Sequence, residues 1–259
     1  MYAFVTAASV PSPEDPLYAE TRGGPKALLD VVGKPMVQWV MDALGGARRV
    51  DGVVLVGLES VDGLTCAKPL RRVSDQGGLL DNVVAGANEI LHLDPTAAQV
   101  LAVSSDIPAI TPEMVDWTID ATAGADDDLD YMVIERATME ARFPGSNRTY
   151  VHLKDGQFCG SDMNVMRAGL VNDRAFWEKL VSARKSPLKQ ASLLGPDLLF
   201  LILARQMSLS RAERMVSRRL RLRGRAIRCP YAEMGMDVDK PHQLALLRED
   251  LAGRRGRPA

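Results

Sequence analysis

Three aspartates in two distant stretches of the chain have side chains that suit a divalent cation. Asp106 directly follows residues 100–103, a short apolar run typical of a buried strand, and Asp237 and Asp239 form an Asp-x-Asp pair. Ligands of parallel sheets bind at the carboxyl ends of the strands. Mg²⁺ is a hard cation, commonly held by one or two carboxylates together with substrate phosphates. The three residues therefore predict a magnesium site, although a single Asp more often caps a turn. Within the Asp-x-Asp pair, we expect one carboxylate to reach the metal and the other to cap a helix beginning near Pro241.

A second group of residues could bind phosphate in the loop after the first predicted strand. That strand covers residues 2–8, and a long polar stretch over residues 10–24 follows it. Glycine lets a backbone approach phosphate closely, and Arg and Lys neutralise the phosphate charge. A mobile surface loop with a chance Gly-Gly explains the local sequence equally well, and the Walker A pattern is absent. The candidate phosphate-binding residues are Ala7, Ala8, Ser9, Arg22, Gly23, Gly24 and Lys26.

The pattern of apolar residues predicts an α/β fold with a mainly parallel sheet and helices on both faces. Short apolar runs alternate with helix-period segments, which is typical of right-handed βαβ crossovers. Residues 149–167 are predicted to form an extended hairpin around a Lys-Asp-Gly turn, and residues 173–222 a helical insertion before the last strand. That last strand is expected at 234–238, followed by a helix over 241–251. One domain covers residues 1–252, and residues 253–259 form a basic, frayed tail.

Composition excludes several broad classes of protein. The chain has 259 residues, 46% of them hydrophobic, with a formal net charge of −1. These values exclude collagen, low-complexity disorder and a disulfide scaffold. Three widely separated cysteines favour reduced thiols. The longest strongly apolar run covers residues 198–204, whereas a membrane span needs about 20 residues. We therefore expect a cytoplasmic protein without a membrane partner, and this run could face a second copy in a homodimer.

The arginine-rich stretch over residues 205–228 allows two interpretations. It holds nine arginines and one acid, Glu213. The first interpretation is a docking surface for an anionic acceptor, RNA or lipid headgroups. The second is a solvated helix, because exposed helix faces are usually charged. The stretch contains no aromatic residue for base stacking, so a nucleic-acid partner is not expected.

Several of these segments together resemble the MobA-like nucleotidyltransferases. The resemblance rests on Pro25-Lys26-x-Leu28, the stretch 32–36, Asp106-Ile107-Pro108 and the closing stretch 237–241, in the family's order. Residues 75–82 are similar to the loop that reads the nucleotide base. The resemblance implies a Rossmann-like fold related to glycosyltransferase type A domains. It also implies Mg²⁺-dependent transfer of a nucleotidyl group from an NTP to the phosphate or hydroxyl of a small-molecule acceptor, with release of pyrophosphate.

The resemblance also implies roles for individual residues. Lys26, Arg22 and Asp106 would be catalytic, and Asp106, Asp237 and Asp239 would bind the metal. The nucleotide would be bound by Ala7, Ala8, Ser9, Gly23, Gly24, Gly77, Gly78, Leu79 and Ser105. The acceptor would be bound by Arg148, Asp162 and Asn164. Two alternatives share the sheet and the Asp-x-Asp pair: a nucleotide-sugar-dependent glycosyltransferase and a non-catalytic nucleotide-binding regulatory protein.

Overall fold

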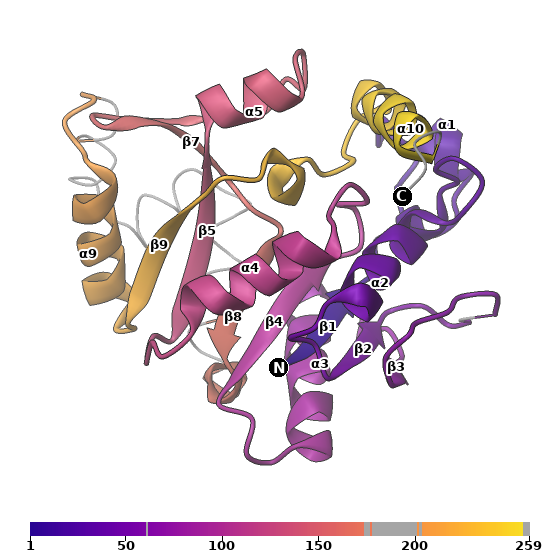
Figure 1. The fold of residues 1–259 in the computed structure, drawn as a ribbon, viewed down its shortest axis with the longest axis horizontal. Helices are drawn as coiled ribbons and strands as arrows, with labels where there is room; N and C mark the ends of the chain where they lie inside the picture. The colour runs from indigo at the N-terminus through magenta and orange to yellow at the C-terminus, as the bar shows by residue number, and fades with distance from the viewer. Residues whose placement is uncertain (61, 174–176, 178–200, 202–203, 256–259) are drawn as a thin grey trace.

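The fold is built on one nine-stranded sheet (Figure 1). A computed structural model of the chain describes residues 1–60, 62–173, 177, 201 and 204–255. Along the sheet the strand order is β3-β2-β1-β4-β8-β5-β7-β6, and β9 pairs with the other side of β5. This is the predicted α/β class with a mainly parallel sheet.

The parallel half of the sheet carries the ends of the strands that position the site. It consists of β1 (Tyr2–Thr6), β2 (Gly52–Val56), β3 (Leu70–Val73) and β4 (Gln99–Ser104). The helices between these strands are α1 (Tyr18–Thr21), the 3₁₀ turn η1 (Lys26–Leu28), α2 (Met36–Gly46) and α3 (Leu79–Leu93). Since β1 and β4 are parallel neighbours, the loops after Thr6 and Ser104 leave the sheet at the same edge.

The other half of the sheet mixes strand directions. It contains α4 (Pro112–Thr122), β5 (Leu129–Glu135), α5 (Arg136–Arg142), β6 (Val151–Leu153), β7 (Gly156–Gly160) and β8 (Met163–Arg167). The turn η2 (Ala168–Asn172), α9 (Leu209–Leu220), β9 (Gly224–Cys229), η3 (Ala232–Gly235) and α10 (Pro241–Arg255) complete the described elements. The predicted hairpin exists, but its arms are β6 and β7. The stretch expected to close it, β8, instead lies antiparallel between β4 and β5.

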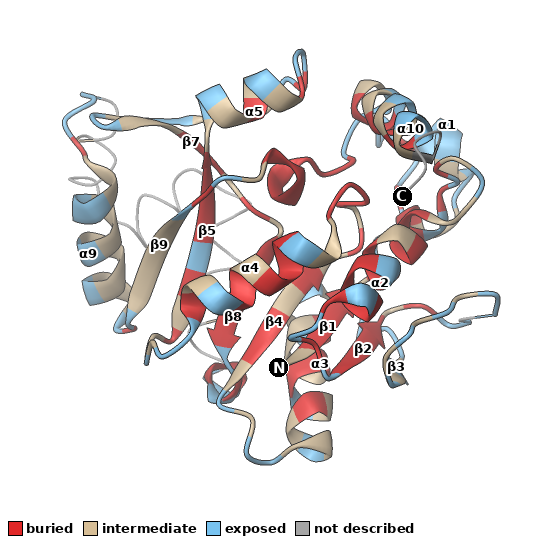
Figure 2. Ribbon diagram, in the orientation of Figure 1, coloured by how far each residue is buried: buried red, intermediate tan, exposed pale blue. Residues whose placement is uncertain are grey.

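Side chains that alternate along the strands pack into two separate buried clusters, one on each face of the sheet. Figure 2 shows the central strands as largely buried. In β1, Ala3 and Val5 pack with α2, α4 and α10, whereas Phe4 packs on the α3 side. Both faces of the strands are thus buried, as expected for a sheet with helices on each side.

Three details of the sequence-based prediction are wrong. The strand β3 at the edge of the sheet was not predicted, and the last strand is β9, at 224–229 rather than 234–238. The final helix extends to Arg255. Arg254 is held in place because its Nη1 donates to the carbonyl oxygen of Ala109 at 2.7 Å.

The helical insertion and the apolar run within it lie largely outside the described residues. The described part of residues 173–222 includes α9, the helix predicted for the arginine-rich stretch. Further along this stretch, Arg225 pairs with Asp130 at 2.7 Å and Arg228 with Glu135 at 2.7 Å. Part of the positive charge is therefore neutralised within the fold. No helix of the described part of the chain is long and apolar enough to cross a membrane.

A four-charge network fixes α10 against α5 and η3. Arg142 donates to Glu233 at 2.7 Å and to Asp250 at 2.6 Å, and Arg254 reaches the same two carboxylates. Glu233 lies on η3 and Asp250 on α10, so the network holds both ends of the segment that carries Asp237.

We expect Arg142→Met to destabilise the protein by about 2 kcal/mol, because it leaves two poorly exposed carboxylates with one cation fewer. This corresponds to a fall in Tm of roughly 4–8 °C in thermal unfolding. Arg136→Met is the matched control, since this exposed residue of the same helix forms no ion pair among the described residues. Its guanidinium donates to the neutral Gln157 and lies over the ring of Tyr150. Equal losses in both variants would show that the network does not stabilise the fold.

Candidate active site

Lys26 is held at the carboxyl edge of the sheet by the loop that follows β1. Its backbone N–H donates to the carbonyl oxygen of Ser9 at 2.8 Å, and it begins the turn η1 after Pro25. The residue is only 7% exposed, which is unusual for a lysine. A buried ammonium requires nearby anions, and the site supplies them.

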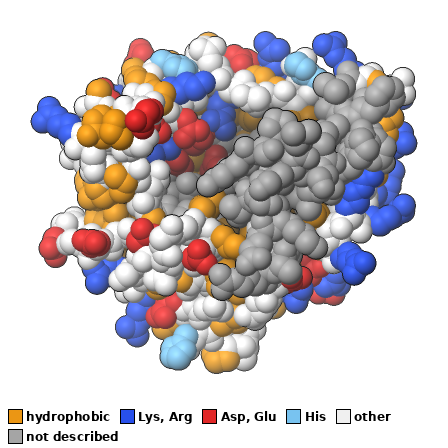
Figure 3. All heavy atoms as spheres, turned by 180° about the vertical axis from the view of Figure 1, so that it is seen from behind, with side chains coloured by type: hydrophobic (Ala, Val, Ile, Leu, Met, Phe, Trp, Pro, Cys, Tyr) orange, Lys and Arg blue, Asp and Glu red, His pale blue; other side chains and the backbone are white. Residues whose placement is uncertain are grey.

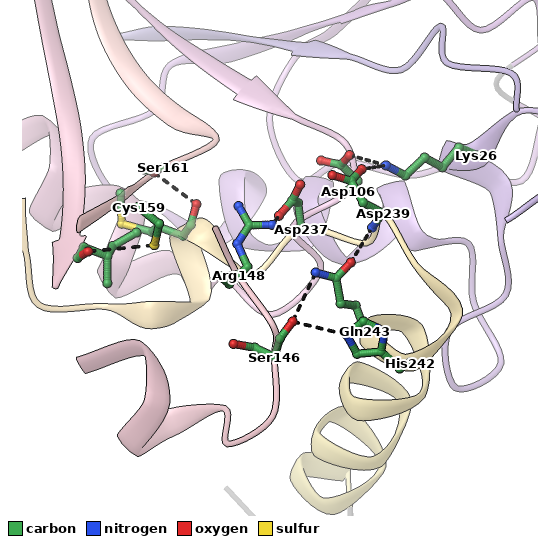
Figure 4. A network of polar contacts seen from close by, with 12 residues as sticks. Lys26, Asp106, Ser146, Arg148, Cys159, Ser161, Asp237, Asp239, His242 and Gln243 are labelled. Atoms are coloured by element: carbon green, nitrogen blue, oxygen red, sulfur yellow. Dashed lines mark hydrogen bonds and ion pairs between the residues drawn. The ribbon is translucent and has the colours of Figure 1, made fainter. Parts of the chain in front are cut away.

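Two of the predicted carboxylates contact this ammonium directly (Figure 4). Lys26 Nζ donates to Asp106 Oδ2 at 2.7 Å and to Asp239 Oδ1 at 2.8 Å. The two chain segments are also joined through their backbones, because Val238 N donates to the carbonyl oxygen of Asp106 at 3.0 Å. Asp106 lies 80 positions and Asp239 lies 213 positions from Lys26 in the sequence, yet both contact its ammonium.

The pKa of Lys26 is raised by this arrangement. Burial is the largest single effect and lowers the pKa, because it disfavours the charged form. The charges of Asp106 and Asp239, together with their hydrogen bonds, outweigh burial. Lys26 is therefore a permanently charged group at neutral pH and suits binding of phosphate oxygens.

Both members of the Asp-x-Asp pair turn toward the site, rather than one capping the final helix. One carboxylate oxygen each of Asp106, Asp237 and Asp239 lies within 4.8 Å of the others. The segment is not a strand: it leaves the turn η3 and enters α10. The start of α10 is instead supported by Gln243, whose Oε1 accepts from the backbone N–H of Asp239 at 2.9 Å.

These three aspartates, which we call the carboxylate cluster, fit a divalent cation. Asp106 Oδ1 is buried and has no hydrogen-bond partner among the described residues. An unpaired buried carboxylate oxygen is costly unless a cation or water satisfies it. Oxygen-only donors are the ligands that Mg²⁺ prefers. Asp237 is 8% exposed, whereas the side chain of Asp239 is 57% exposed, so the cluster opens to solvent on the Asp239 side.

Arg148 approaches the carboxylate cluster from the side opposite Lys26 (Figure 4). It comes from the loop between α5 and β6 and forms an ion pair with Asp237. This loop is tied to α10, because Gln243 Nε2 donates to the carbonyl oxygen of Ser146 at 3.3 Å. Cys159 lies beside the guanidinium, which lowers the pKa of its thiol, but burial is the larger effect and the pKa is raised.

Three further predicted residues, Ser105, Asp162 and Asn164, are held by hydrogen bonds to neighbouring strands and loops. Ser105 precedes Asp106 and is fixed to β1 by its N–H, which donates to Thr6 O at 3.1 Å. Asp162 follows β7 and receives a backbone bond from Ser104. Asn164 uses its side chain structurally, accepting from Met132 N at 2.8 Å and donating to Ser161 O at 2.9 Å. Its role in acceptor binding thus has no support from its contacts.

The loop over residues 75–82 presents backbone groups at the start of α3. Asp75 Oδ1 accepts from Gly77 N at 3.0 Å and from Asn82 Nδ2 at 2.7 Å, and Asn82 is buried. Gly77 adopts a positive φ of 83°, and Leu79 is 49% exposed. The loop is therefore a preformed turn with an exposed apolar side chain, which suits the predicted approach to a nucleotide base.

Arg22, Gly23 and Gly24 lie in the turn that ends α1. Arg22 is exposed and has the left-handed backbone that closes this helix. Within the described residues its side chain has no ion pair, so the structure brings Lys26, but not Arg22, to the carboxylates.

The start of the loop after β1 packs tightly on Gly57. Ala7 N donates to Val56 O at 2.8 Å, which continues the strand pairing past Thr6. A Cβ on Gly57 would lie 2.4 Å from the Cβ of Ala8, and Gly57 has a φ of 103°. Because Gly57, which follows β2, has no side chain, Ala8 can pack directly against its backbone.

We expect Gly57→Ala to cost about 1–3 kcal/mol more than Gly63→Ala, because both place a side chain at positive φ but only Gly57 has neighbours to displace. Chemical denaturation of both variants measures this difference. Equal costs would mean that the loop after β1 moves freely to accept the added atom.

Comparisons with known proteins agree with this geometry. Residues 20–206 match the MobA-like NTP transferase domain. The chain belongs to this family. A hypothetical transferase from Thermus thermophilus is 32% identical and superposes with a TM-score of 0.77 over 94% of this chain and all of that one.

Two further relatives place these results in context. A "Probable molybdenum cofactor guanylyltransferase" of Thermococcus gammatolerans is 28% identical over 97 residues, which are 38% of this chain and 48% of the relative. The chain thus spans about half the length of this curated relative. A CMP:2-keto-3-deoxy-manno-octonic acid synthetase complexed with CTP has the same fold, with a TM-score of 0.58 and 18% identity over 98% of this chain and 99% of the synthetase.

The back of the molecule carries acidic and basic side chains close together. Seen from behind, acidic side chains gather in a hollow next to basic ones (Figure 3).

Sequence reasoning found the three aspartates, Lys26 and Arg148, but not Gln243. A Gln three residues into a helix that follows an Asp-x-Asp pair is a capping signal that could have indicated its role.

Proposed function

We propose that the protein transfers a nucleotidyl group from an NTP to a phosphate or hydroxyl oxygen of a small-molecule acceptor. The observation that carries this proposal is the convergence of the carboxylate cluster on Lys26, with Asp106 and Asp239 2.7 and 2.8 Å from its ammonium. Membership in the MobA-like family supports the same chemistry. The acceptor oxygen forms a bond to the α-phosphorus, the bond from that phosphorus to the bridging oxygen breaks, and pyrophosphate leaves.

The chain's own residues act by positioning and by neutralising charge. Lys26 binds phosphate oxygens of the nucleotide and stabilises the negative charge of the transition state. The backbone groups of Gly77 and Gly78 approach the base, and Arg148 binds a phosphate of the acceptor near Asp237. No protein nucleophile is required, since holding the two reactants in line supplies much of the rate.

The carboxylate cluster would hold Mg²⁺ in this proposal. When bound, the ion supplies charge neutralisation at the phosphates and fixes their orientation. Asp237 would be the buried ligand, Asp106 a partly buried one, and Asp239 the solvent-side ligand. The proposal also includes a cytoplasmic location and a homodimer.

Pyrophosphate release tests the reaction. The protein is incubated with Mg²⁺, each of the four NTPs and a library of phosphorylated and hydroxylated acceptors. We expect release with one preferred NTP, and GTP is the first to test because the curated relative is named as a guanylyltransferase.

The same assay separates the two alternatives. Release of a nucleoside diphosphate from nucleotide sugars, without pyrophosphate from NTPs, would instead indicate a glycosyltransferase. Tight NTP binding without turnover across the whole library would indicate a regulatory protein.

A further inference from the structure

Each member of the carboxylate cluster is paired with a basic side chain of the chain itself. Lys26 bridges Asp106 and Asp239, and Arg148 pairs with Asp237. The pairing is poorly accessible to water: the side chains of Lys26 and Arg148 are 9% and 15% exposed. Two internal cations therefore neutralise most of the charge of three aspartates.

This pairing opposes the binding of a metal ion on its own. A divalent cation among the three carboxylates would lie close to both the ammonium and the guanidinium. Like charges at such separations repel strongly where solvent screening is weak. The metal would also have to replace hydrogen bonds that the carboxylates already accept.

A polyphosphate removes this obstacle because it can take over both cations. Lys binds phosphate as a point charge, and Arg binds it through two parallel N–H donors. Once the two basic groups contact phosphate oxygens, the carboxylates are free for a metal. The unpartnered Asp106 Oδ1 already offers one oxygen that no basic group occupies among the described residues.

We propose that Lys26 and Arg148 are internal counter-ions that suppress metal binding by the carboxylate cluster until a polyphosphate displaces them. Metal and nucleotide then bind with positive coupling, and each raises the affinity for the other by the same factor. The inference rests on the proposed function only in taking the nucleotide as the source of the polyphosphate.

Binding of Mn²⁺ to the nucleotide-free protein tests the proposal, with the free ion followed by electron paramagnetic resonance. We expect weak binding by the natural chain and binding about tenfold tighter or more in Lys26→Met and in Arg148→Met. Lys26→Arg keeps the charge and should bind as weakly as the natural chain. Lys154→Met is the matched control, because Lys154 is exposed in the turn between β6 and β7, and it should leave binding unchanged.

A second substitution locates the gained affinity. Asp237→Asn in the Lys26→Met background should abolish the gain if the ion binds at the cluster. Unchanged or weaker Mn²⁺ binding in both methionine variants would overturn the proposal, as would a gain that survives Asp237→Asn. Circular dichroism establishes folding, and Arg148→Met gives an independent result if Lys26→Met does not fold.

The Mn²⁺-binding test and the tests of nucleotidyl transfer can fail independently of one another. Absence of NTP binding or pyrophosphate release would refute nucleotidyl transfer and leave the Mn²⁺ result standing. Conversely, an active enzyme whose methionine variants gain no Mn²⁺ affinity would refute only the counter-ion role.

Discussion

Lys26→Ala is expected to lower kcat by about 100-fold or more. The ammonium is the one buried cation that contacts two members of the carboxylate cluster among the described residues, at 2.7 and 2.8 Å. Loss of one group that stabilises developing anionic charge typically costs 10²–10³-fold in kcat. Steady-state pyrophosphate release with the preferred NTP measures the effect.

A matched change separates this role from a general loss of charge. Lys154→Ala removes an exposed lysine from the turn between β6 and β7 and should leave kcat unchanged. An unchanged turnover number in Lys26→Ala would remove Lys26 from the reaction.

Asp106→Asn should lower kcat/KM by at least about 100-fold. The substitution keeps the shape of the side chain but removes a charged oxygen ligand. Losing an outer-shell partner of a metal site already costs 10–100-fold, so loss of a direct ligand should cost no less. The measurement is the Mg²⁺ dependence of pyrophosphate release, in which we expect the half-saturating Mg²⁺ concentration to rise.

Asp62→Asn provides the control, because Asp62 is exposed in the turn between β2 and β3 and is not part of the carboxylate cluster. Thermal unfolding should remain a single cooperative transition in both variants. Normal activity and Mg²⁺ dependence of Asp106→Asn would contradict the assignment of the cluster as a metal site.

Local sequence predicted the elements that position the site. Asp106 follows β4 and Lys26 follows the loop after β1, and both strands are continuous apolar runs. Parallel neighbours bring the loops after them to one edge, so the juxtaposition of Lys26 and Asp106 follows from pattern and topology.

The missed strands lack that apolar signal. β9 contains Arg225 and Arg228, and β3 carries exposed arginines at the edge of the sheet. The arginines of β9 are neutralised by acids on the neighbouring strand β5, since Asp130 pairs with Arg225 and Glu135 with Arg228. Such pairing exists only after the chain folds, so it could not be inferred from periodicity.

The ion pair between Arg148 and Asp237 could not be inferred from the sequence either, because it also forms only in the folded chain. Arg148 lies in a loop whose position depends on its bonds to Gln243 of α10. A lone Arg in a turn-rich segment gives no signal of its partner. Its residue type suggested phosphate binding, and the fold adds the buried ion pair from which the counter-ion role follows.

A thermal-shift titration with the four NTPs, each with and without Mg²⁺, tests most directly whether these residues hold a metal-bound triphosphate. For one NTP at 100 times its Kd, with Mg²⁺ present, we predict about 2.7 kcal/mol of added stability, or a rise in Tm of roughly 5–10 °C. The rise should be smaller without Mg²⁺, and in Asp106→Asn it should fall to about the Mg²⁺-free level. No shift with any NTP, or an equal shift in Asp106→Asn, would contradict the account.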